Sequence, residues 1–339
     1  MAQFLQLALF VCISVAYCNA IKISLAGTDA ALFDKFEKSF NKKFINPSER
    51  VKRLGIFVKN LAQMKLLNLL HPETEFGINE FSDMTAEEFQ SRLMPADLQD
   101  HFAAMNISSD EQKDETSRRQ KRATPPTNFD WRTYQKITAV RNQGSCGCCW
   151  SFASVAAIEA HYAIRYGTLV ALSDQQLLDC DTVNGGCNGG YPYYAMQYVI
   201  TNGLKQQYYY SYTGTKGACR TSGAGGSSYY LRSFTQLSTD ENYLVDYVYN
   251  YGPVTMCFTF PSTMQHYVSG VVTLTASQCE AQKSGAHAVT IIGFGTENNV
   301  PYFTAKNSWG LNWGENGFFR FRRNYNFCNF TQNLVAPIF

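Results

Sequence analysis

Apolar residues in the first ninety positions recur at steps of three and four, the spacing of one face of a helix. They predict one helix over Asp29–Asn41 and a longer one that begins after Asn46 and stops before His71-Pro72. Asn46 can cap the second helix, and Pro47 suits its first helical position. Thr85 and Glu88 have the spacing of a capping box and predict a third, short helix.

The pattern changes character in the second half of the chain. Helical spacing predicts helices over Cys149–Tyr166, ended by Gly167, then over Ser173–Asp179 with Ser173 and Gln176 as a capping box, and over Tyr191–Ile200. Alternating or continuous apolar runs then predict strands over Val254–Phe260, Gly270–Leu274, Ala288–Phe294, Tyr302–Lys306 and Gly317–Arg322. Helices followed by strands indicate an α+β protein, or two lobes that meet at an interface.

A polar, aperiodic stretch, Met94–Thr127, separates the two halves and predicts an exposed linker. It contains the basic run Ser117-Arg118-Arg119-Gln120-Lys121-Arg122. In a secreted chain such a run is a target for processing proteases, so we expect cleavage within residues 117–125.

Composition and the N-terminus narrow the class of protein. The 339 residues are 45% apolar, which allows a sizeable core, and a net charge of +2 gives no electrostatic case for nucleic-acid binding. Phe4–Ala16 is apolar but too short to span a bilayer, and Cys18-Asn19-Ala20 fits a signal-peptide cleavage site. No other segment predicts a membrane span. We therefore expect a signal peptide over residues 1–20 and a route through the secretory pathway.

Three of the eleven cysteines fall within four positions, Cys146, Cys148 and Cys149. A redox C-x-x-C motif predicts a preceding aromatic residue and a surrounding βαβ unit, whereas here Trp150 follows. A zinc site needs a second pair of ligands, and the sequence has none, so we expect no metal and no cofactor. Without Cys12 and Cys18, nine cysteines remain. Because nine is odd, at least one thiol is left over as a pairing or reactive group.

A nucleophile explains these thiols better. Cys149 opens a predicted helix, His287 enters a predicted strand roughly 140 residues later, and Asn307 leaves another strand roughly 160 residues after Cys149. This order and spacing are typical of a two-lobed cysteine hydrolase. A helix N-terminus and an imidazolium both favour the thiolate, the form that attacks a carbonyl.

At this point the whole chain resembles the papain-like cysteine proteases of the cathepsin L type. The resemblance rests on Gln143–Trp150, His287 and Asn307-Ser308-Trp309, on Asn188–Pro192 and Trp313–Gly317, and on Asp130-Trp131-Arg132. In the prodomain it rests on Glu49, Arg53, Phe57, Asn60, Met64 and Asn68, with Met64 where Ile is usual, and on Gly77, Asn79, Phe81 and Asp83. Cys148 departs from the signature, which has Ser or Ala before the nucleophile.

The resemblance implies an α+β, papain-like two-lobe fold, with a helical lobe, a β-barrel-like lobe and the active-site cleft between them. It implies a signal peptide (1–20), an inhibitory prodomain and linker (21–122), and a mature peptidase domain (123–339). The helical lobe would span about 134–232, and the β lobe about 233–339 together with 123–133. The function implied is a cysteine endopeptidase made as a zymogen. The alternative is a non-catalytic binding or structural protein that keeps the fold.

Residue roles follow from the same resemblance. Catalysis is assigned to Cys149, His287, Asn307 and Gln143, with Gln143 and the Cys149 backbone N–H as oxyanion donors. Substrate binding is assigned to Gly189, Gly190, Tyr191, Pro192, Cys257, Gly285, Ala288, Asn333 and Trp309. Disulfides are expected at Cys146–Cys187, Cys180–Cys219 and Cys279–Cys328. Cys148 and Cys257 then remain as small packed side chains, with a redox regulatory role as the alternative for Cys148.

Further expectations concern modification, partners and compartment. Asn106 and Asn329 lie in N-glycosylation sequons. The expected partners are protein and peptide substrates, the chain's own prodomain as inhibitor, and cystatin-like inhibitors. We expect a monomer that acts in a lysosome or vacuole or outside the cell.

Overall fold

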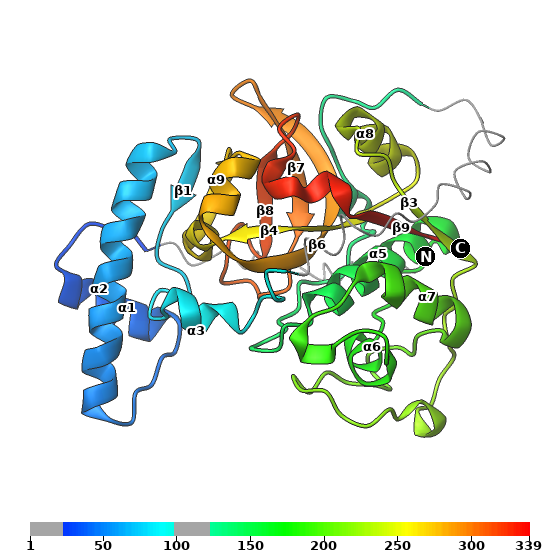
Figure 1. Ribbon diagram of the computed structural model, residues 1–339, viewed down its shortest axis with the longest axis horizontal. Coiled ribbons are helices and arrows are strands. Elements are labelled where there is room, and N and C mark those ends of the chain that lie inside the picture. The colour runs from blue at the N-terminus through cyan, green and yellow to red at the C-terminus, as the bar shows by residue number, and fades with distance from the viewer. Residues whose placement is uncertain (1–22, 98–122) are drawn as a thin grey trace, which may run out of the picture.

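The structure is a computed structural model, and it describes residues 23–97 and 123–339. The predicted signal peptide, the Asn106 sequon and the basic run at 117–122 lie outside the described residues. Figure 1 shows three parts: a helical prodomain at one end, a β lobe in the middle and a helical lobe beside it. The α+β expectation is confirmed.

The prodomain helices begin where the caps predict. Helix α1 (Asp29–Ser39) crosses the long helix α2 (Pro47–Leu70), and Asn46 caps α2 by accepting from the Ser48 N–H. The short helix α3 (Ala86–Gln90) has both bonds of the Thr85–Glu88 capping box. Buried apolar side chains hold α1 and α2 together, and Phe33, Phe36 and Phe57 are fully buried.

Three helices form the helical lobe, α5 (Cys149–Tyr166), α6 (Asp174–Cys180) and α7 (Pro192–Asn202). Gly167 ends α5 with a φ of 77°, a left-handed conformation that suits glycine. Only half of the capping box expected for α6 is present. Ser173 accepts from the Gln176 N–H, but the Gln176 amide instead donates to the Gly203 carbonyl and accepts from the Lys205 N–H.

One nine-stranded sheet carries the β lobe. Its path is β1-β5-β8-β7-β6-β4-β9-β3, and β2 pairs with β6. The path does not close within the described residues, so the barrel-like lobe is an open sheet. The strands are β1 (Thr74–Phe76), β2 (Phe129–Asp130), β3 (Ser233–Gln236), β4 (Val254–Pro261), β5 (Tyr267–Val272), β6 (Lys283–Glu297), β7 (Val300–Lys306), β8 (Phe318–Arg322) and β9 (Leu334–Ile338).

The five predicted strands correspond to β4–β8, but several elements were missed. Strands β1, β2, β3 and β9 have two to five residues, too few to show a period. Helix α8 (Glu241–Asn250) lies before the first predicted strand, and α9 (Ala276–Ala281) lies between two predicted strands. Strand β1 belongs to the prodomain and pairs antiparallel with β5. The prodomain is therefore joined to the sheet of the β lobe by backbone hydrogen bonds.

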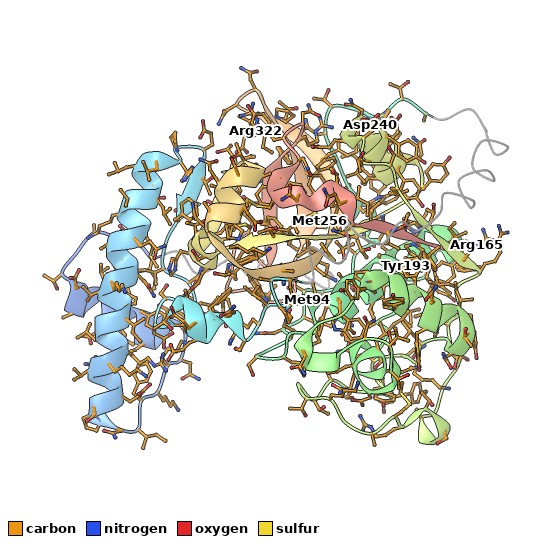
Figure 2. All side chains as sticks on the ribbon, viewed as in Figure 1. Met94, Arg165, Tyr193, Asp240, Met256 and Arg322 are labelled. Carbon is orange, nitrogen blue, oxygen red and sulfur yellow. A yellow bond between two sulfur atoms is a disulfide. The ribbon has the colours of Figure 1, made fainter. Side chains whose placement is uncertain are left out.

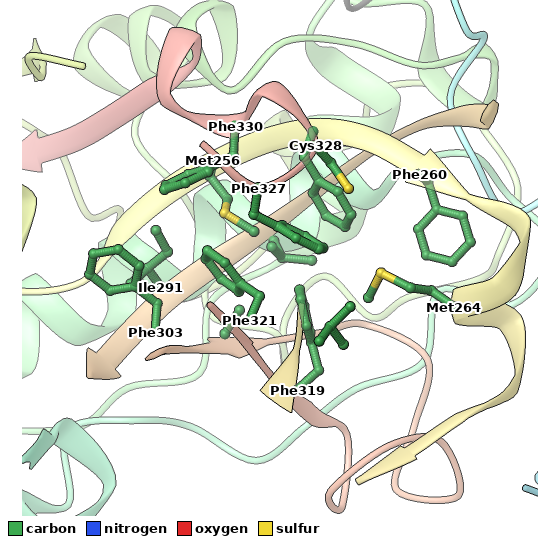
Figure 3. Packing of buried hydrophobic residues seen from close by; sticks show 14 of the residues in the cluster. Met256, Phe260, Met264, Ile291, Phe303, Phe319, Phe321, Phe327, Cys328 and Phe330 are labelled. Carbon is green, nitrogen blue, oxygen red and sulfur yellow. The ribbon is translucent and has the colours of Figure 1, made fainter. Parts of the chain in front are cut away.

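Aromatic side chains fill the core of the β lobe. Figure 3 shows Phe319, Phe321, Phe327 and Phe330 packed together in this core, with Met256 beside them. The Phe321 and Phe327 rings are 4.9 Å apart. Tight packing of large rings makes the lobe rigid, and this rigidity fixes the positions of β6 and β7, the strands that carry His287 and lead into Asn307.

Candidate active site

Cys149 is the first residue of α5, at the boundary between the lobes. Its Sγ accepts a hydrogen bond of 3.3 Å from the Ala288 N–H on β6, and its side chain is fully buried. Burial raises the pKa of Cys149 to about 12, although the N–H groups of Ala288, Trp150 and Cys149 lower it. In the structure described here, Cys149 is a neutral thiol.

His287 lies next to this bond, on β6. Its Nε2 is 2.8 Å from the Asn307 Oδ1, which also accepts from the Ser308 N–H at 2.8 Å. Because this oxygen can only accept, Nε2 carries the proton and Nδ1 has the free lone pair. Burial lowers the pKa of His287 to about 4, so the ring is neutral. Nδ1 has no hydrogen-bond partner within the described ranges.

Trp309 covers the imidazole and its bond to Asn307. The indole stacks on the His287 ring at 4.4 Å with an interplanar angle of 26°. The same indole meets Phe89 of α3 edge-on at 5.0 Å. Trp309 is fully buried, so the His287 ring and the prodomain share one aromatic cluster from which water is excluded.

Gln143 is held rigidly by both of its polar ends. Its side-chain Oε1 accepts from the Ser308 hydroxyl at 2.6 Å, and its Nε2 donates at 2.8 Å to the Cys146 carbonyl. The second Nε2 proton goes to the carbonyl of Arg92 in the prodomain, also at 2.8 Å. A prodomain carbonyl thus occupies the donor that the sequence assigns to an oxyanion.

The prodomain chain runs between β6, the strand that carries His287, and the loop that precedes Cys149. Gln90 donates to the Ser284 carbonyl at 2.8 Å, and Met94 forms an antiparallel bridge with Ala286, with N···O distances of 2.9 and 3.0 Å. Met94, labelled in Figure 2, lies between the sheet and the helical lobe and is 1% exposed. Our expectation that the exposed linker begins at Met94 is therefore wrong, because this residue is anchored in the cleft.

Two glycines allow this close approach. A Cβ at Gly147 would lie 2.8 Å from the Leu93 carbonyl oxygen and 2.5 Å from that of Cys187. A Cβ at Gly285 would lie 2.7 Å from the Met94 carbonyl oxygen. Only glycine leaves room for the passing backbone at both positions.

The residues assigned to the pocket fall into two groups. Cys257 is paired with Ala288 across β4 and β6, and both belong to a buried cluster that contains Met94 and packs against Tyr191. Met256 pairs with Leu334, so the ladder of β4 and β9 brings Asn333 next to Cys257. Gly189 and Gly190 instead lie between the 3-10 turn at Gly186–Asn188 and α7, which begins at Pro192. A Cβ on Gly190 would be 2.6 Å from the Asn184 oxygen, which accepts from the Tyr191 N–H.

The cysteines separate into pairs and free thiols. Disulfides join Cys146–Cys187, Cys180–Cys219 and Cys279–Cys328, the pairs implied by the family resemblance. Cys148, Cys149 and Cys257 are free and buried. Because Cys146 is bonded to Cys187, it is not available to Cys149 as a redox partner.

Polar contacts of the motif residues hold the prodomain together, and Asn79 also ties it to the β lobe. Arg53 donates to Glu49 and Glu88 at 2.6 Å each, and Lys42 pairs with Asp83 at 2.9 Å. Asn60 donates to the Ser82 and Met84 carbonyls, and Asn79 donates across the interface to the Gln265 carbonyl at 2.8 Å. The motif residues therefore fix the loop that leads into the cleft.

Several residues of the site could not be found from the sequence. These are Arg92, Leu93, Ala286 and Tyr212, which contact it through backbone atoms or from distant loops. Within residues 23–97 and 123–339, no group of histidines, cysteines and acidic residues is arranged to hold a metal ion. In the same ranges, no helix is both long and apolar enough to cross a membrane.

Comparison with known proteins agrees with this geometry. Residues 125–338 match the family described as papain family cysteine protease, and residues 33–89 match the cathepsin propeptide inhibitor domain. Over 308 residues the chain is 35% identical to the viral cathepsin of Mamestra configurata nucleopolyhedrovirus, covering 90% of this chain and 87% of that protein.

Solved structures of precursors show the same architecture. The proform of the ragweed pollen cysteine protease Amb a 11 is 30% identical, with a TM-score of 0.79, covering 91% of this chain and 94% of that one. Digestive procathepsin L 3 of Tenebrio molitor is 28% identical, with a TM-score of 0.75, covering 93% and 100%. The chain belongs to the papain family of cysteine proteases. It is a peptidase made as a zymogen, with its own propeptide domain as inhibitor.

Proposed function

We propose that this chain is an endopeptidase in which Cys149 is the nucleophile and His287 the acid–base partner. Asn307 orients the imidazole, Trp309 shields it, and Gln143 with the Cys149 N–H stabilises the oxyanion. The observation that carries the proposal is the Asn307–His287 hydrogen bond, which leaves Nδ1 free as a base beside the helix that begins at Cys149.

Removal of the prodomain activates the pair. Exposure to water removes the burial that raises the pKa of Cys149 and lowers that of His287. The thiol proton moves from Sγ to Nδ1, and the resulting thiolate is favoured by the N-terminus of α5 and by the imidazolium. The pair that is neutral in the zymogen thereby becomes ionic in the mature enzyme.

The reaction then proceeds through an acyl-enzyme. The thiolate attacks the peptide carbonyl carbon, and the oxyanion accepts hydrogen bonds from Gln143 and the Cys149 N–H. The C–N bond breaks as His287 returns its proton to the leaving amine. Water then attacks the thioester while His287 takes the water proton. The carboxylic acid leaves, sulfur departs as the thiolate, and the thiolate–imidazolium pair is restored.

The path of the prodomain supports an endopeptidase. Gln90, Arg92 and Met94 hydrogen-bond successive points of the cleft, and the chain continues beyond each end of this segment. A cleft that a continuous chain can cross accepts an internal segment of a substrate. The pocket for the residue two positions before the scissile bond is formed by Tyr191, Pro192, Cys257, Gly285, Ala288 and Asn333, with Gly189 and Gly190 along its rim.

The remaining assignments complete the proposal. The signal peptide (1–20) directs the chain into the secretory pathway, and cleavage within 117–125 separates the prodomain from a mature domain that begins near residue 123. The enzyme acts as a monomer in a lysosome, in a vacuole or outside the cell, and cystatin-like inhibitors bind its cleft. Asn329, a partly exposed residue, is a glycosylation acceptor.

One experiment tests the catalytic assignment against the non-catalytic alternative. The full precursor and its Cys149→Ala variant are acidified, and cleavage of a peptide library and the new N-terminus are recorded. We expect turnover of internal bonds only with Cys149 present. Turnover that survives in Cys149→Ala would contradict the assignment, and a wild-type protein without any turnover would support the non-catalytic alternative.

A further inference from the structure

Cys148, the residue that departs from the family signature, makes a specific hydrogen bond. Its Sγ is 3.1 Å from the Tyr212 hydroxyl, and the same hydroxyl donates to the Gln143 backbone carbonyl at 2.7 Å. A phenol has one proton, and a carbonyl can only accept. The Tyr212 proton is therefore used on Gln143, so the Cys148 S–H must be the donor to Tyr212.

The Cys148 thiol is suited to donate. It is fully buried at the residue before α5, and burial raises its pKa, so it keeps its proton. Tyr212 is fixed in turn, because its ring meets Phe152 edge-on at 5.0 Å. Two hydrogen bonds thus run in series, from the Cys148 thiol to the Tyr212 hydroxyl and from that hydroxyl to the Gln143 carbonyl. The side chains of Cys148 and Tyr212 are both held in place by packing.

The acceptor at the end of this chain is the residue assigned to the oxyanion. The Gln143 N–H donates to the Ser308 carbonyl at 2.8 Å, from the β lobe, and its carbonyl accepts from Tyr212, from the helical lobe. Its peptide groups are therefore tied to both lobes. Loss of the Tyr212 bond would free one side of the backbone that aims the Nε2 donor.

We propose that Tyr212, supported by the thiol of Cys148, is a positioning residue for the oxyanion donor Gln143. This inference rests on the proposed role of Gln143. It assigns Cys148 a function in catalysis through hydrogen-bond donation, with no redox change and no metal.

The test uses the mature enzyme, prepared by activating the full precursor. A peptide aldehyde forms a tetrahedral adduct with Cys149 whose oxygen needs the oxyanion donor, whereas iodoacetamide alkylates the thiolate without forming an oxyanion. For each variant we measure kcat, KM, the aldehyde inhibition constant and the rate of alkylation. A loss in kcat and aldehyde affinity, with KM and alkylation preserved, is specific to the oxyanion donor.

We expect Tyr212→Phe to lower kcat and aldehyde affinity by about threefold to tenfold, the size of one neutral hydrogen bond, with KM and alkylation within about twofold. Cys148→Ala should show the same selective loss to a smaller extent, since S–H is a weak donor, and Cys148→Ser should restore it. Tyr229→Phe is the matched control. Its hydroxyl accepts from Gln206 at 2.7 Å in the same lobe and has no bond to Gln143.

Two outcomes would overturn the inference. One is unchanged aldehyde affinity and kcat in Tyr212→Phe, and the other is an equal fall in alkylation, which indicates general structural damage. If Tyr212→Phe does not fold, the Cys148→Ala and Cys148→Ser pair decides alone, and equal behaviour of the two overturns it. Gln143→Ala distinguishes a wrong role for Tyr212 from a wrong role for Gln143 itself. If Gln143→Ala leaves aldehyde affinity unchanged, the oxyanion assignment itself is wrong.

Discussion

The reactivity of Cys149 depends on whether the prodomain covers it. In the zymogen this thiol has no exposed surface, and burial raises its pKa to about 12. The residue itself is the same before and after activation, so its environment supplies the switch.

We predict that iodoacetamide labels Cys149 in the mature enzyme at neutral pH and that labelling in the intact precursor is slower by at least about a hundredfold, because the pKa and the access both change. The measurement is mass mapping of labelled peptides over time. Cys148 is the internal control, since it is a buried free thiol outside the proposed substrate pocket. Equal labelling of Cys149 in the two forms would contradict the covering role of the prodomain.

Asn333 gives a second test at the residue scale, on specificity. The other side chains of the pocket that we propose for it are mostly apolar, and a bulky apolar side chain gains roughly 1.5–3 kcal/mol on burial. We expect Leu, Phe or Val to be preferred two positions before the scissile bond and Arg to be poorer, because the neutral amide of Asn333 cannot compensate a buried guanidinium.

Asn333→Glu should shift acceptance toward Arg, and Asn333→Gln, which keeps a neutral amide, is its control. The quantity to compare is kcat/KM for paired dipeptide substrates that differ only at this position. If the unmodified enzyme accepts Arg as well as Leu at this position, the assignment of Asn333 to this pocket is wrong.

At the scale of elements, α3 and the segment that follows it are what hold the cleft closed. Phe89 is buried against Trp309 and Phe260, with ring distances of 5.0 and 5.8 Å, and the next residues bond to Ser284, Gln143 and Ala286. The inhibitory contact therefore joins a hydrophobic anchor to a strand-like run of backbone bonds.

We expect Phe89→Ala to loosen the prodomain, because truncation of a buried Phe typically costs about 3–5 kcal/mol. The precursor should then self-process faster at pH 5 and show activity before cleavage. Val51→Ala is the control, since Val51 is 70% exposed on α2. The measurement is the rate of precursor loss on a denaturing gel, and a wild-type rate for Phe89→Ala would show that the anchor lies elsewhere.

At the scale of the whole molecule, pH acts on the prodomain through two carboxyl groups, Glu88 and Glu80. Protonation of these two groups changes the stability of the prodomain in opposite directions. Burial would raise the pKa of Glu88, but its hydrogen bonds from Arg53 and the Thr85 N–H leave it below the usual 4.5. Its stabilising contribution is present at neutral pH and is lost as pH falls below about 4.5. Burial raises the pKa of Glu80 to about 6, against the nearby Lys42 and Arg92. The Glu80 charge therefore destabilises the prodomain at neutral pH. Protonation of Glu80 below about pH 6 removes this destabilisation.

These signs predict that the precursor stays closed near pH 5.5 and self-processes only closer to pH 4. Glu88→Gln lacks the stabilising charge at every pH. Activation of this variant should therefore start at a higher pH than that of the wild type. Glu80→Gln should make the precursor more stable at pH 7 and leave the onset near pH 4. The onset is read from processing rates between pH 7 and pH 3.5, and an unchanged onset in Glu88→Gln would remove this residue from the switch.

Local features predicted much of the element structure. Asn46, Thr85 and Ser173 cap the helices that their positions indicate, and Gly167 ends α5, because caps and periodicity act within a few residues. Short strands such as β1 and β3 could not be found in this way. Their residues become strands only by pairing with β5 and β9, and that pairing depends on chain far away in sequence.

The sequence by itself determined the family, the order of Cys149, His287 and Asn307, and the zymogen organisation, because motif spacing and residue chemistry are local and survive without coordinates. The tertiary structure alone decided what occupies the site. It placed the Arg92 carbonyl on Gln143, Met94 against Ala286, and the Tyr212 hydroxyl between Cys148 and Gln143. These contacts join residues 51, 192, 64 and 69 positions apart. Three of the four use at least one backbone group, and hydrogen bonds of backbone groups leave no mark on residue identity.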